Sequence, residues 1–314
     1  MPEPGSTFAS GADARYGYHL LNLLGSLKAR SDVFDRVVVF DLGLTPHQRE
    51  LADSVRGVEV REVPAFVPHW RQGFTWKPWV WTHLDTTETV FWLDAGATLL
   101  RSLAGALAQI EERGYFLVSQ GRRLEELVPA DYWELYGLPR SAGAREYVAA
   151  GIIGFRVGSG FYRRVVVPTY EDCLAGRSLG FSAAELDGLN RGLQATPEPV
   201  VRDCAHFRWD QSLLNIHLAL ALPDAFVNDL DEYAGWRSPR DHPRQVIWSH
   251  RRAGPLSYLP RVPYTRNGLR NRLFGLRYRV RWWLALHSKY VTRATYEWKL
   301  RKTWSSLRRR RAPR

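Results

Sequence analysis

The stretch Thr89-Val-Phe-Trp-Leu-Asp-Ala-Gly-Ala97 indicates the fold more clearly than any other part of the chain. Its apolar run resembles a buried strand of a parallel sheet, which is apolar on both faces. Asp94 follows the run directly, at the place where open parallel sheets bind ligands. The small residues after it let a ligand approach the backbone. An acid here can bind a metal or a ribose, and the alternative is a carboxylate that only caps the turn or the next helix.

The rest of the first 260 residues repeats this kind of run between helix-like segments. Similar apolar runs lie at 36–40, 115–118, 152–155 and 245–248. The leucines of residues 16–29 fall on one helical face, Ser102 can cap a second helix, and Asp210 can cap a third that runs through His217. Alternating strands and helices predict an α/β domain with a mostly parallel sheet flanked by helices.

The composition excludes several classes of protein. The 314 residues are 45% hydrophobic and 24% charged, which rules out a disordered or collagen-like chain. Cys173 and Cys204 are the only cysteines, too few for a disulfide framework or a four-thiolate metal site. There is no apolar stretch of about 18 residues, and the first residues lack the basic start and apolar core of a secretory signal. We therefore expect a cytoplasmic protein.

The charge divides the chain in two. Residues 261–314 contain 17 Lys+Arg and one acid, a net charge of +16, whereas residues 1–260 carry a net charge of −4. Tyrosine, phenylalanine and tryptophan are interleaved with these basic residues, as in segments that bind the headgroup layer of a membrane. Nucleic acid is the competing partner, and a helix packed on its own domain is the third alternative. We therefore divide the chain into a globular domain, 1–260, and a basic aromatic tail, 261–314.

Four short motifs, in order along the chain, resemble those of nucleotide-sugar glycosyltransferases with the GT-A fold. Leu93-Asp-Ala-Gly96 is similar to the Leu-Asp-Ala-Asp motif of family 8, whose carboxylates hold a divalent metal and the donor. Residues 150–156 are similar to the strand that lines the sugar pocket. Asp210-Gln-Ser-Leu-Leu-Asn215 resembles the segment at the reaction centre. Trp248-Ser-His250 is placed like the late histidine that completes the metal and diphosphate site.

A closer resemblance is to a largely uncharacterised branch of these enzymes. This branch carries Asp-Leu-Gly-Leu after a strand and a Trp-Lys-Pro helix, which Asp41-Leu-Gly-Leu44 and Trp76-Lys-Pro78 match. The resemblance extends over roughly residues 7–250. It implies a UDP-sugar donor and, as in family 8, retention of the anomeric configuration. Basic aromatic tails are familiar in bacterial members that modify lipid-linked glycans.

The chemistry of glycosyl transfer requires positive charge, because the leaving group is a diphosphate. Lys77 is notable because the chain has only five lysines and this one stands among aromatic residues. The alternative is a lysine that only packs beside core tryptophans. We expect Lys77 and His250 to bind the diphosphate, and Arg251 and Arg252 are further candidates.

The resemblance assigns the remaining site residues. Asp210 and Gln211 are expected to act at the reaction centre, although Asp210 as a simple helix cap is an alternative. Asp94 and His250 would hold Mn²⁺ or Mg²⁺, but the second Asp of Asp-X-Asp, usually the stronger ligand, is replaced here. The other positions expected to bind the nucleotide-sugar are Ser10, Gly11, Gly96 and Gly151.

Together these features predict a GT-A-like enzyme that transfers a sugar from a nucleotide-sugar to a glycan or lipid-linked acceptor. We expect it to work at the inner face of the cell membrane, held there by the tail. The alternative is a nucleic-acid-binding protein that uses the tail, beside an inactive sugar-nucleotide-binding domain. Gly176-Arg-Ser-Leu-Gly180 fits the nucleophile elbow of serine hydrolases, but no apolar strand precedes it, and we set this motif aside.

Overall fold

The structure is a computed structural model of the whole chain. It describes the backbone of residues 5–31, 33–85, 89–180, 207–233, 235, 243–251, 256–265 and 268–287. All statements on structure below refer to these residues.

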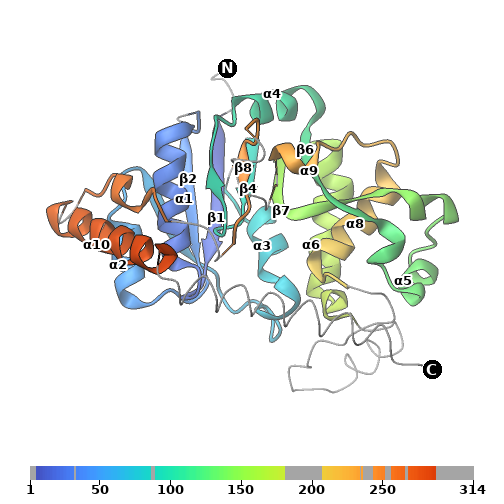
Figure 1. Cartoon of the computed structure of the whole chain (residues 1–314). Helices are drawn as coiled ribbons and strands as arrows, with labels where there is room; N and C mark the ends of the chain where they lie inside the picture. Colours follow the sequence, from blue (N-terminus) through green and yellow to red (C-terminus); the bar gives the residue numbers. More distant parts are fainter. Residues whose placement is uncertain are drawn as a thin grey trace, which may run out of the picture.

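A six-stranded sheet forms the centre of the protein (Figure 1). Its strands are β1 (Ser6–Ala12), β2 (Arg36–Asp41), β3 (Val58–Glu62), β4 (Thr89–Leu93), β6 (Tyr115–Arg123) and β7 (Glu146–Arg156). They are ordered β3-β2-β1-β4-β7-β6. The first four strands in this order are mutually parallel, and β7 runs antiparallel to both of its neighbours. The sheet is therefore mostly parallel, as the sequence predicts.

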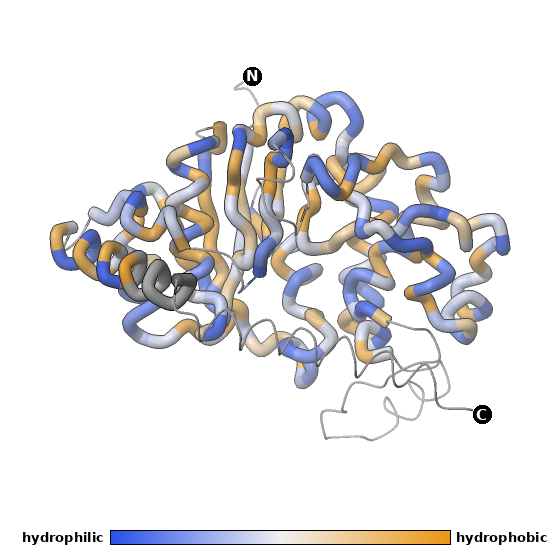
Figure 2. Tube along the Cα trace, viewed as in Figure 1, coloured by the Kyte–Doolittle hydropathy of each residue, from blue (hydrophilic) through white to orange (hydrophobic). Residues whose placement is uncertain are grey.

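Helices cover both faces of the sheet. They are α1 (Gly17–Arg30), α2 (Pro46–Asp53), α3 (Trp76–Thr82), α4 (Ala104–Arg113), α5 (Ala130–Leu135), α6 (Val167–Leu174), α8 (Asp210–Ala221), α9 (Leu230–Tyr233) and α10 (Gly268–His287). In β4, Val90 and Trp92 belong to a core with α3, α8 and the short helical segment Tyr162–Val166, whereas Phe91 and Leu93 belong to a core with α1 and α4. This alternation follows from the pleat of a strand, and burial on both faces explains why the strand is continuously apolar. In Figure 2 the hydrophobic colours accordingly run along the strands.

The predicted α/β class and mostly parallel sheet are confirmed, and two local predictions are wrong. Residues 245–248 were expected to form a sheet strand, but only Ile247–Trp248 is extended (β8), and it pairs with β5 (Thr98–Leu99) in a separate two-stranded sheet. Asp210 does not cap α8, because it is the first residue of that helix and Trp209 occupies the cap position. The Asp210 carboxylate is therefore available for contacts elsewhere.

The first part of the basic segment packs on the sheet domain. Val262 is buried with residues of α1 and α2, and the backbone N–H of Thr265 donates to the carbonyl of Ser54 at 2.6 Å. In α10, the Phe274 ring lies against the rings of Tyr18 and His47, with centroids 5.4 and 5.3 Å apart. The division at residue 260 stays a prediction, and residues 288–314 lie outside the described residues. No described helix is long and apolar enough to cross a bilayer.

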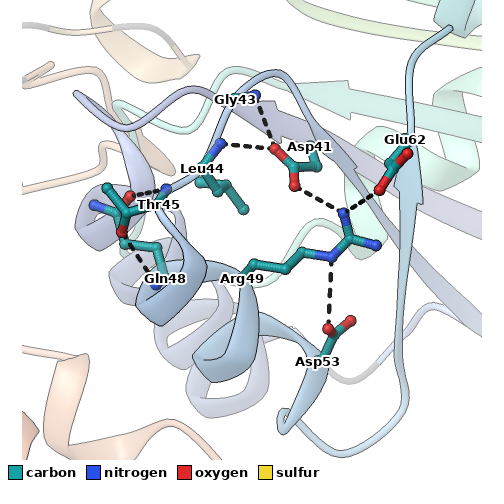
Figure 3. Close-up of polar contacts among 8 residues, drawn as sticks. All are labelled: Asp41, Gly43, Leu44, Thr45, Gln48, Arg49, Asp53 and Glu62. Atoms are coloured by element: carbon teal, nitrogen blue, oxygen red, sulfur yellow. Dashed lines mark hydrogen bonds and ion pairs between the residues drawn. The ribbon is translucent and has the colours of Figure 1, made fainter.

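The Asp41-Leu-Gly-Leu44 motif forms the turn that ends β2 (Figure 3). Asp41 Oδ1 accepts hydrogen bonds from the backbone N–H groups of Gly43 and Leu44 at 2.8 and 2.7 Å. Its Oδ2 lies 2.8 Å from Nη1 of Arg49 in α2. Burial alone would raise the pKa of Asp41, but these donors outweigh it and hold the pKa below its ordinary value. The motif therefore has a structural role, which is to fix α2 to the end of β2.

Replacing Asp41 by alanine tests this role. We expect Asp41→Ala to lower the free energy of unfolding by about 2 kcal/mol, because two backbone N–H donors and a guanidinium lose their acceptor. Asp53→Ala is the matched control, since Asp53 contacts the same guanidinium at 3.5 Å but its side chain is 48% exposed. It should cost less than about 0.5 kcal/mol. Equal losses in urea titrations of the two variants would contradict the turn-fixing role.

Candidate active site

Three charged side chains from separate elements meet beyond the carboxyl end of β4. The ammonium Nζ of Lys77, in α3, lies 3.1 Å from Oδ1 of Asp94 and 3.9 Å from Oδ2 of Asp210. The side chains of Lys77 and Asp210 are 6% and 4% exposed, whereas that of Asp94 is 49% exposed. The cluster thus has a buried part and one carboxylate that faces outward.

The charges of the cluster depend on one another. Burial alone would lower the pKa of Lys77, but the carboxylates of Asp94 and Asp210 outweigh burial, and the pKa lies above its ordinary value. Burial raises the pKa of Asp210 to about 7; the charge of Lys77 opposes the rise and that of Asp94 adds to it. Oδ2 of Asp210 is buried without a hydrogen-bond partner. Lys77 is therefore charged at neutral pH, while Asp210 can gain or lose a proton there.

Backbone geometry places Asp94. Its N–H donates to the carbonyl of Gly151 at 2.9 Å, and Nε1 of Trp92 donates to its Oδ1 at 2.9 Å. A Cβ at Gly151 would stand 2.8 Å from Oδ2 of Asp94, so a side chain at this position would displace the carboxylate from where it lies. The glycine that was predicted to bind the donor therefore positions Asp94 in the first place.

Three residues with strained backbones surround the cluster. Among the described residues, Phe74, Trp209 and Arg251 are the only non-glycine residues with positive φ, at 55°, 49° and 52°. Nζ of Lys77 lies 5.3 Å from the centroid of the Phe74 ring, which packs against Trp209 at 5.4 Å. Such conformations cost about 1–3 kcal/mol each and gather at functional sites. Their convergence makes this cluster the candidate functional site.

The start of α8 is held tightly against β7. The side-chain amide of Asn215 accepts from the N–H of Val148 at 2.7 Å and donates to the carbonyl of the same residue at 3.0 Å. Nε2 of Gln211 donates to that carbonyl at 3.0 Å and to Oε1 of Gln120 at 3.2 Å. These bonds fix the first turn of α8, and with it Asp210. They leave Oε1 of Gln211 as the acceptor that a ligand can meet.

The other predicted residues have structural contacts. Ser10 and Gly11 both lie within β1, and the Ser10 hydroxyl donates to the carbonyl of Leu93 at 2.7 Å. The His250 ring is buried, and its Nε2 forms a hydrogen bond of 2.7 Å with Oγ1 of Thr98. Burial, and secondly the charge of His19, lowers the pKa of His250 to about 4, so the ring is neutral at pH 7. Among the described residues no hydrogen bond or ion pair joins His250 to Asp94, and the predicted ligand roles of these residues stay predictions.

Two arginines, Arg208 and Arg251, lie at the border of the cluster. Arg251 N–H donates to the carbonyl of Gly96 at 2.6 Å, and its charge acts on both Lys77 and Arg208. Arg208, two residues before Asp210, was missed in the sequence, because in an arginine-rich chain neither its type nor its spacing distinguishes it. Arg252 lies outside the described residues.

Comparisons with known proteins give similar structures but no sequence relative. No protein-family model and no curated protein matches the chain. The apo structure of the bifunctional glycosyltransferase WbbM is similar with 12% identity and a TM-score of 0.46; the match covers 74% of this chain and 40% of WbbM. The galactosyltransferase LgtC with donor and acceptor sugar analogues is similar with 15% identity and a TM-score of 0.45, over 86% of this chain and 95% of LgtC. An active-site mutant of LgtC is similar with 15% identity and a TM-score of 0.47. The match covers 77% of this chain and 86% of the mutant's chain.

The charge state of Asp210 can be tested through stability. Its pKa is raised from 3.8 to about 7, so the folded chain favours the protonated form. This contribution is complete below pH 3.8 and is lost as the pH rises through 7. Asp210→Asn mimics the protonated form, so its advantage over wild type should be near zero at about pH 4, grow to at most about 4 kcal/mol by pH 7, and then stay constant.

Thermal unfolding of both proteins between about pH 4 and pH 9 gives this difference. Asp85→Asn is the control, because that side chain is 82% exposed, and its difference from wild type should not change with pH. If Asp210→Asn and wild type lose stability in parallel over the whole range, the buried carboxylate does not titrate near neutrality.

Proposed function

We propose that the chain is a glycosyltransferase of the GT-A type, which moves a sugar from a nucleotide-sugar, a UDP-sugar, to an acceptor hydroxyl. The observation that carries the proposal is the cluster of Lys77, Asp94 and Asp210 beyond the carboxyl end of β4, in a mostly parallel sheet. This edge is where open α/β sheets bind ligands. Strained residues around the cluster support a role in binding or chemistry rather than in folding alone.

The proposed roles follow from exposure and charge. Asp94, half exposed, accepts hydrogen bonds from ribose or sugar hydroxyls. Lys77 stabilises the negative charge that develops on the diphosphate. Asp210, whose pKa is raised to about 7, and Oε1 of Gln211 contact the sugar and the reaction centre. We propose these roles on the basis of side-chain chemistry and of the motifs that the four residues match.

The reaction exchanges one bond for another at the anomeric carbon. The bond from this carbon to the diphosphate oxygen breaks, and its electron pair stays on the diphosphate. The acceptor oxygen bonds to the same carbon, and its proton passes to the diphosphate or to the Asp210 carboxylate. Family 8-like retention of configuration is the stereochemistry that we propose, with a glycan or lipid-linked acceptor.

Nucleotide binding tests the proposal. UDP or a UDP-sugar at about 100 times its Kd should stabilise the chain by about 2.7 kcal/mol and raise Tm by about 5 °C. Asp94→Asn should retain the circular dichroism spectrum but lose transfer or hydrolysis of the UDP-sugar, because it removes a charge from an exposed position. Glu62→Gln, 77% exposed in the Asp41 network, is the charge-matched control. The absence of a shift with UDP-, GDP- and TDP-sugars at millimolar concentration would exclude this function.

We also propose that helix α10 binds the surface of an anionic membrane. Four apolar side chains recur at helical spacing along α10 and form an exposed stripe. They are Leu269 (75% exposed), Leu273 (56%), Leu276 (50%) and Val280 (50%). The opposite side of the helix packs on the protein through Phe274. α10 contains no acidic residue, and Figure 2 shows hydrophilic and hydrophobic residues alternating along it. An exposed apolar stripe between arginines suits the headgroup layer of a bilayer, and on this basis we propose that the enzyme is a peripheral protein of the inner membrane face.

The stripe can be separated from the charge by mutation. A triple variant should weaken binding to phosphatidylglycerol-containing vesicles about tenfold or more, because apolar insertion is lost while every arginine remains. Its substitutions are Leu269→Ser, Leu273→Ser and Leu276→Ser. Sedimentation in low salt and in about 0.5 M NaCl gives the affinity. Wild type should retain part of its binding in high salt.

Leu220→Ser serves as the control for exposed leucine, since Leu220 is 43% exposed in α8. It should bind vesicles like wild type. Binding that disappears completely in high salt, together with retention on DNA, would favour the nucleic-acid alternative and contradict membrane docking.

A further inference from the structure

The divalent metal that the GT-A resemblance implies does not fit the residue at position 96. Gly96 stands where the second aspartate of Asp-X-Asp is expected. A Cβ there would lie 2.9 Å from Cα of Arg251 and 3.2 Å from Cε1 of Tyr16. Arg251 also holds this backbone by a hydrogen bond of 2.6 Å to the Gly96 carbonyl. The fold therefore excludes any side chain, and hence a carboxylate ligand, at this position.

The two remaining predicted ligands are engaged elsewhere. Oδ1 of Asp94 already contacts Nζ of Lys77 at 3.1 Å and Nε1 of Trp92 at 2.9 Å. His250 uses Nε2 on Thr98, and its Nδ1, although free of a hydrogen-bond partner, is buried. Within the described part of the chain, no group of three or more His, Cys, Asp or Glu side chains is arranged so that it could hold a metal ion. A cation already occupies the position beside Asp94, and it is an ammonium of the protein.

Positive charge at the site exceeds what the acids balance. Asp94 and Asp210 face Lys77, but neither Arg208 nor Arg251 has an ion pair with an acid among the described residues. Burial lowers the pKa of Arg208, and the charge of Arg251 lowers it further. Arg251 has a positive φ of 52°, and Arg208 directly precedes Trp209, whose φ is 49°. Like charges kept together in this way are typical of an anion site.

We propose that Arg208, Arg251 and Lys77 neutralise the donor diphosphate in place of a divalent metal, so that nucleotide binding does not require Mn²⁺ or Mg²⁺. This inference rests on the proposed glycosyltransferase function. The charges agree, because the diphosphate of a nucleotide-sugar carries two negative charges, which the two arginines match. A further negative charge develops as the bond to the sugar breaks, and Lys77 is the cation placed to stabilise it.

Binding of UDP to the full chain tests metal independence. Thermal shift and calorimetry are carried out with UDP in EDTA and again with Mn²⁺. We expect the same Kd within a factor of about two in both, and weaker binding as salt rises, since the contact is ionic. Binding only with Mn²⁺ would overturn metal independence and leave the transferase proposal intact. No binding of any nucleotide under either condition would overturn the transferase proposal itself.

Variants at Arg251 identify the cation. Arg251→Gly removes the guanidinium and suits the positive φ, so the fold should be retained. We expect it to raise the Kd for UDP about tenfold or more, without rescue by Mn²⁺. Arg251→Lys keeps a charge and should lose less. Arg56→Ala, an exposed arginine near the start of β3, is the control and should bind UDP like wild type. An unchanged Kd in Arg251→Gly would remove Arg251 from the site.

Discussion

The ammonium of Lys77 is the charge around which the site is arranged. A buried ammonium is expensive to desolvate, and it stays charged here only because two carboxylates lie within 4 Å. These groups come from α3, from the end of β4 and from the start of α8, which are far apart in sequence. Their mutual dependence fixes the three elements relative to one another. Removal of either acid would lower the pKa of Lys77, because both carboxylates raise it.

The strain at the site is offset by tight packing beneath it. Gly73, before Phe74, lies so close to the carbonyl of Ser178 that a Cβ would stand 2.7 Å from it. The hydroxyls of Thr75 and Ser178 share a hydrogen bond of 2.8 Å. The segment 176–180, which resembles a nucleophile elbow, therefore supports the residues that lead into α3, the helix that carries Lys77. Its Ser178 is fully buried, and this explains the motif without a catalytic serine.

A second polar cluster fixes this supporting segment. Asp172 accepts from Tyr136 and from Arg177 at 2.5 Å, and Nε2 of His217 lies 2.6 Å from its carboxylate. Burial by itself would raise the pKa of Asp172, but these partners lower it overall. Because every member has a partner, the cluster adds rigidity rather than a further ligand site. Rigid support of this kind allows the strained residues above it to persist.

Sequence reasoning succeeded where the signal is local. The run 89–93 is apolar because both faces of β4 are covered. The strand begins and ends at the predicted residues. It failed at 245–248, because a short apolar run shows burial but not its pairing partner. The antiparallel direction of β7 also depends on chain connections that no periodicity records. For the site, Asp94, Lys77 and Asp210 were predicted from motifs, and the structure brings them together.

The sequence alone could not show which arginines lack an ion pair with an acid among the described residues. Arg208 and Arg251 look like ordinary surface arginines in the sequence. In the fold the charge of Arg251 acts on both Lys77 and Arg208, and neither arginine has an ion pair with an acid among the described residues. A Gly-for-Asp difference likewise indicates only a lost ligand, whereas the structure shows that the backbone of Arg251 fills the space. The two observations explain each other. The residue that excludes a carboxylate is also the residue that supplies a cation, so the site keeps its positive charge.

The position of α10 connects this chemistry to the membrane proposal. Phe274 contacts Tyr18 and His47, which lie near the starts of α1 and α2 and so follow the carboxyl ends of β1 and β2. Asp94 follows the carboxyl end of β4, which is parallel to both strands. The helix and the site therefore lie toward the same edge of the sheet (Figure 1). A bilayer held against the outer face of α10, as we propose, would lie on the same side of the sheet as the site, which suits the proposed lipid-linked acceptor.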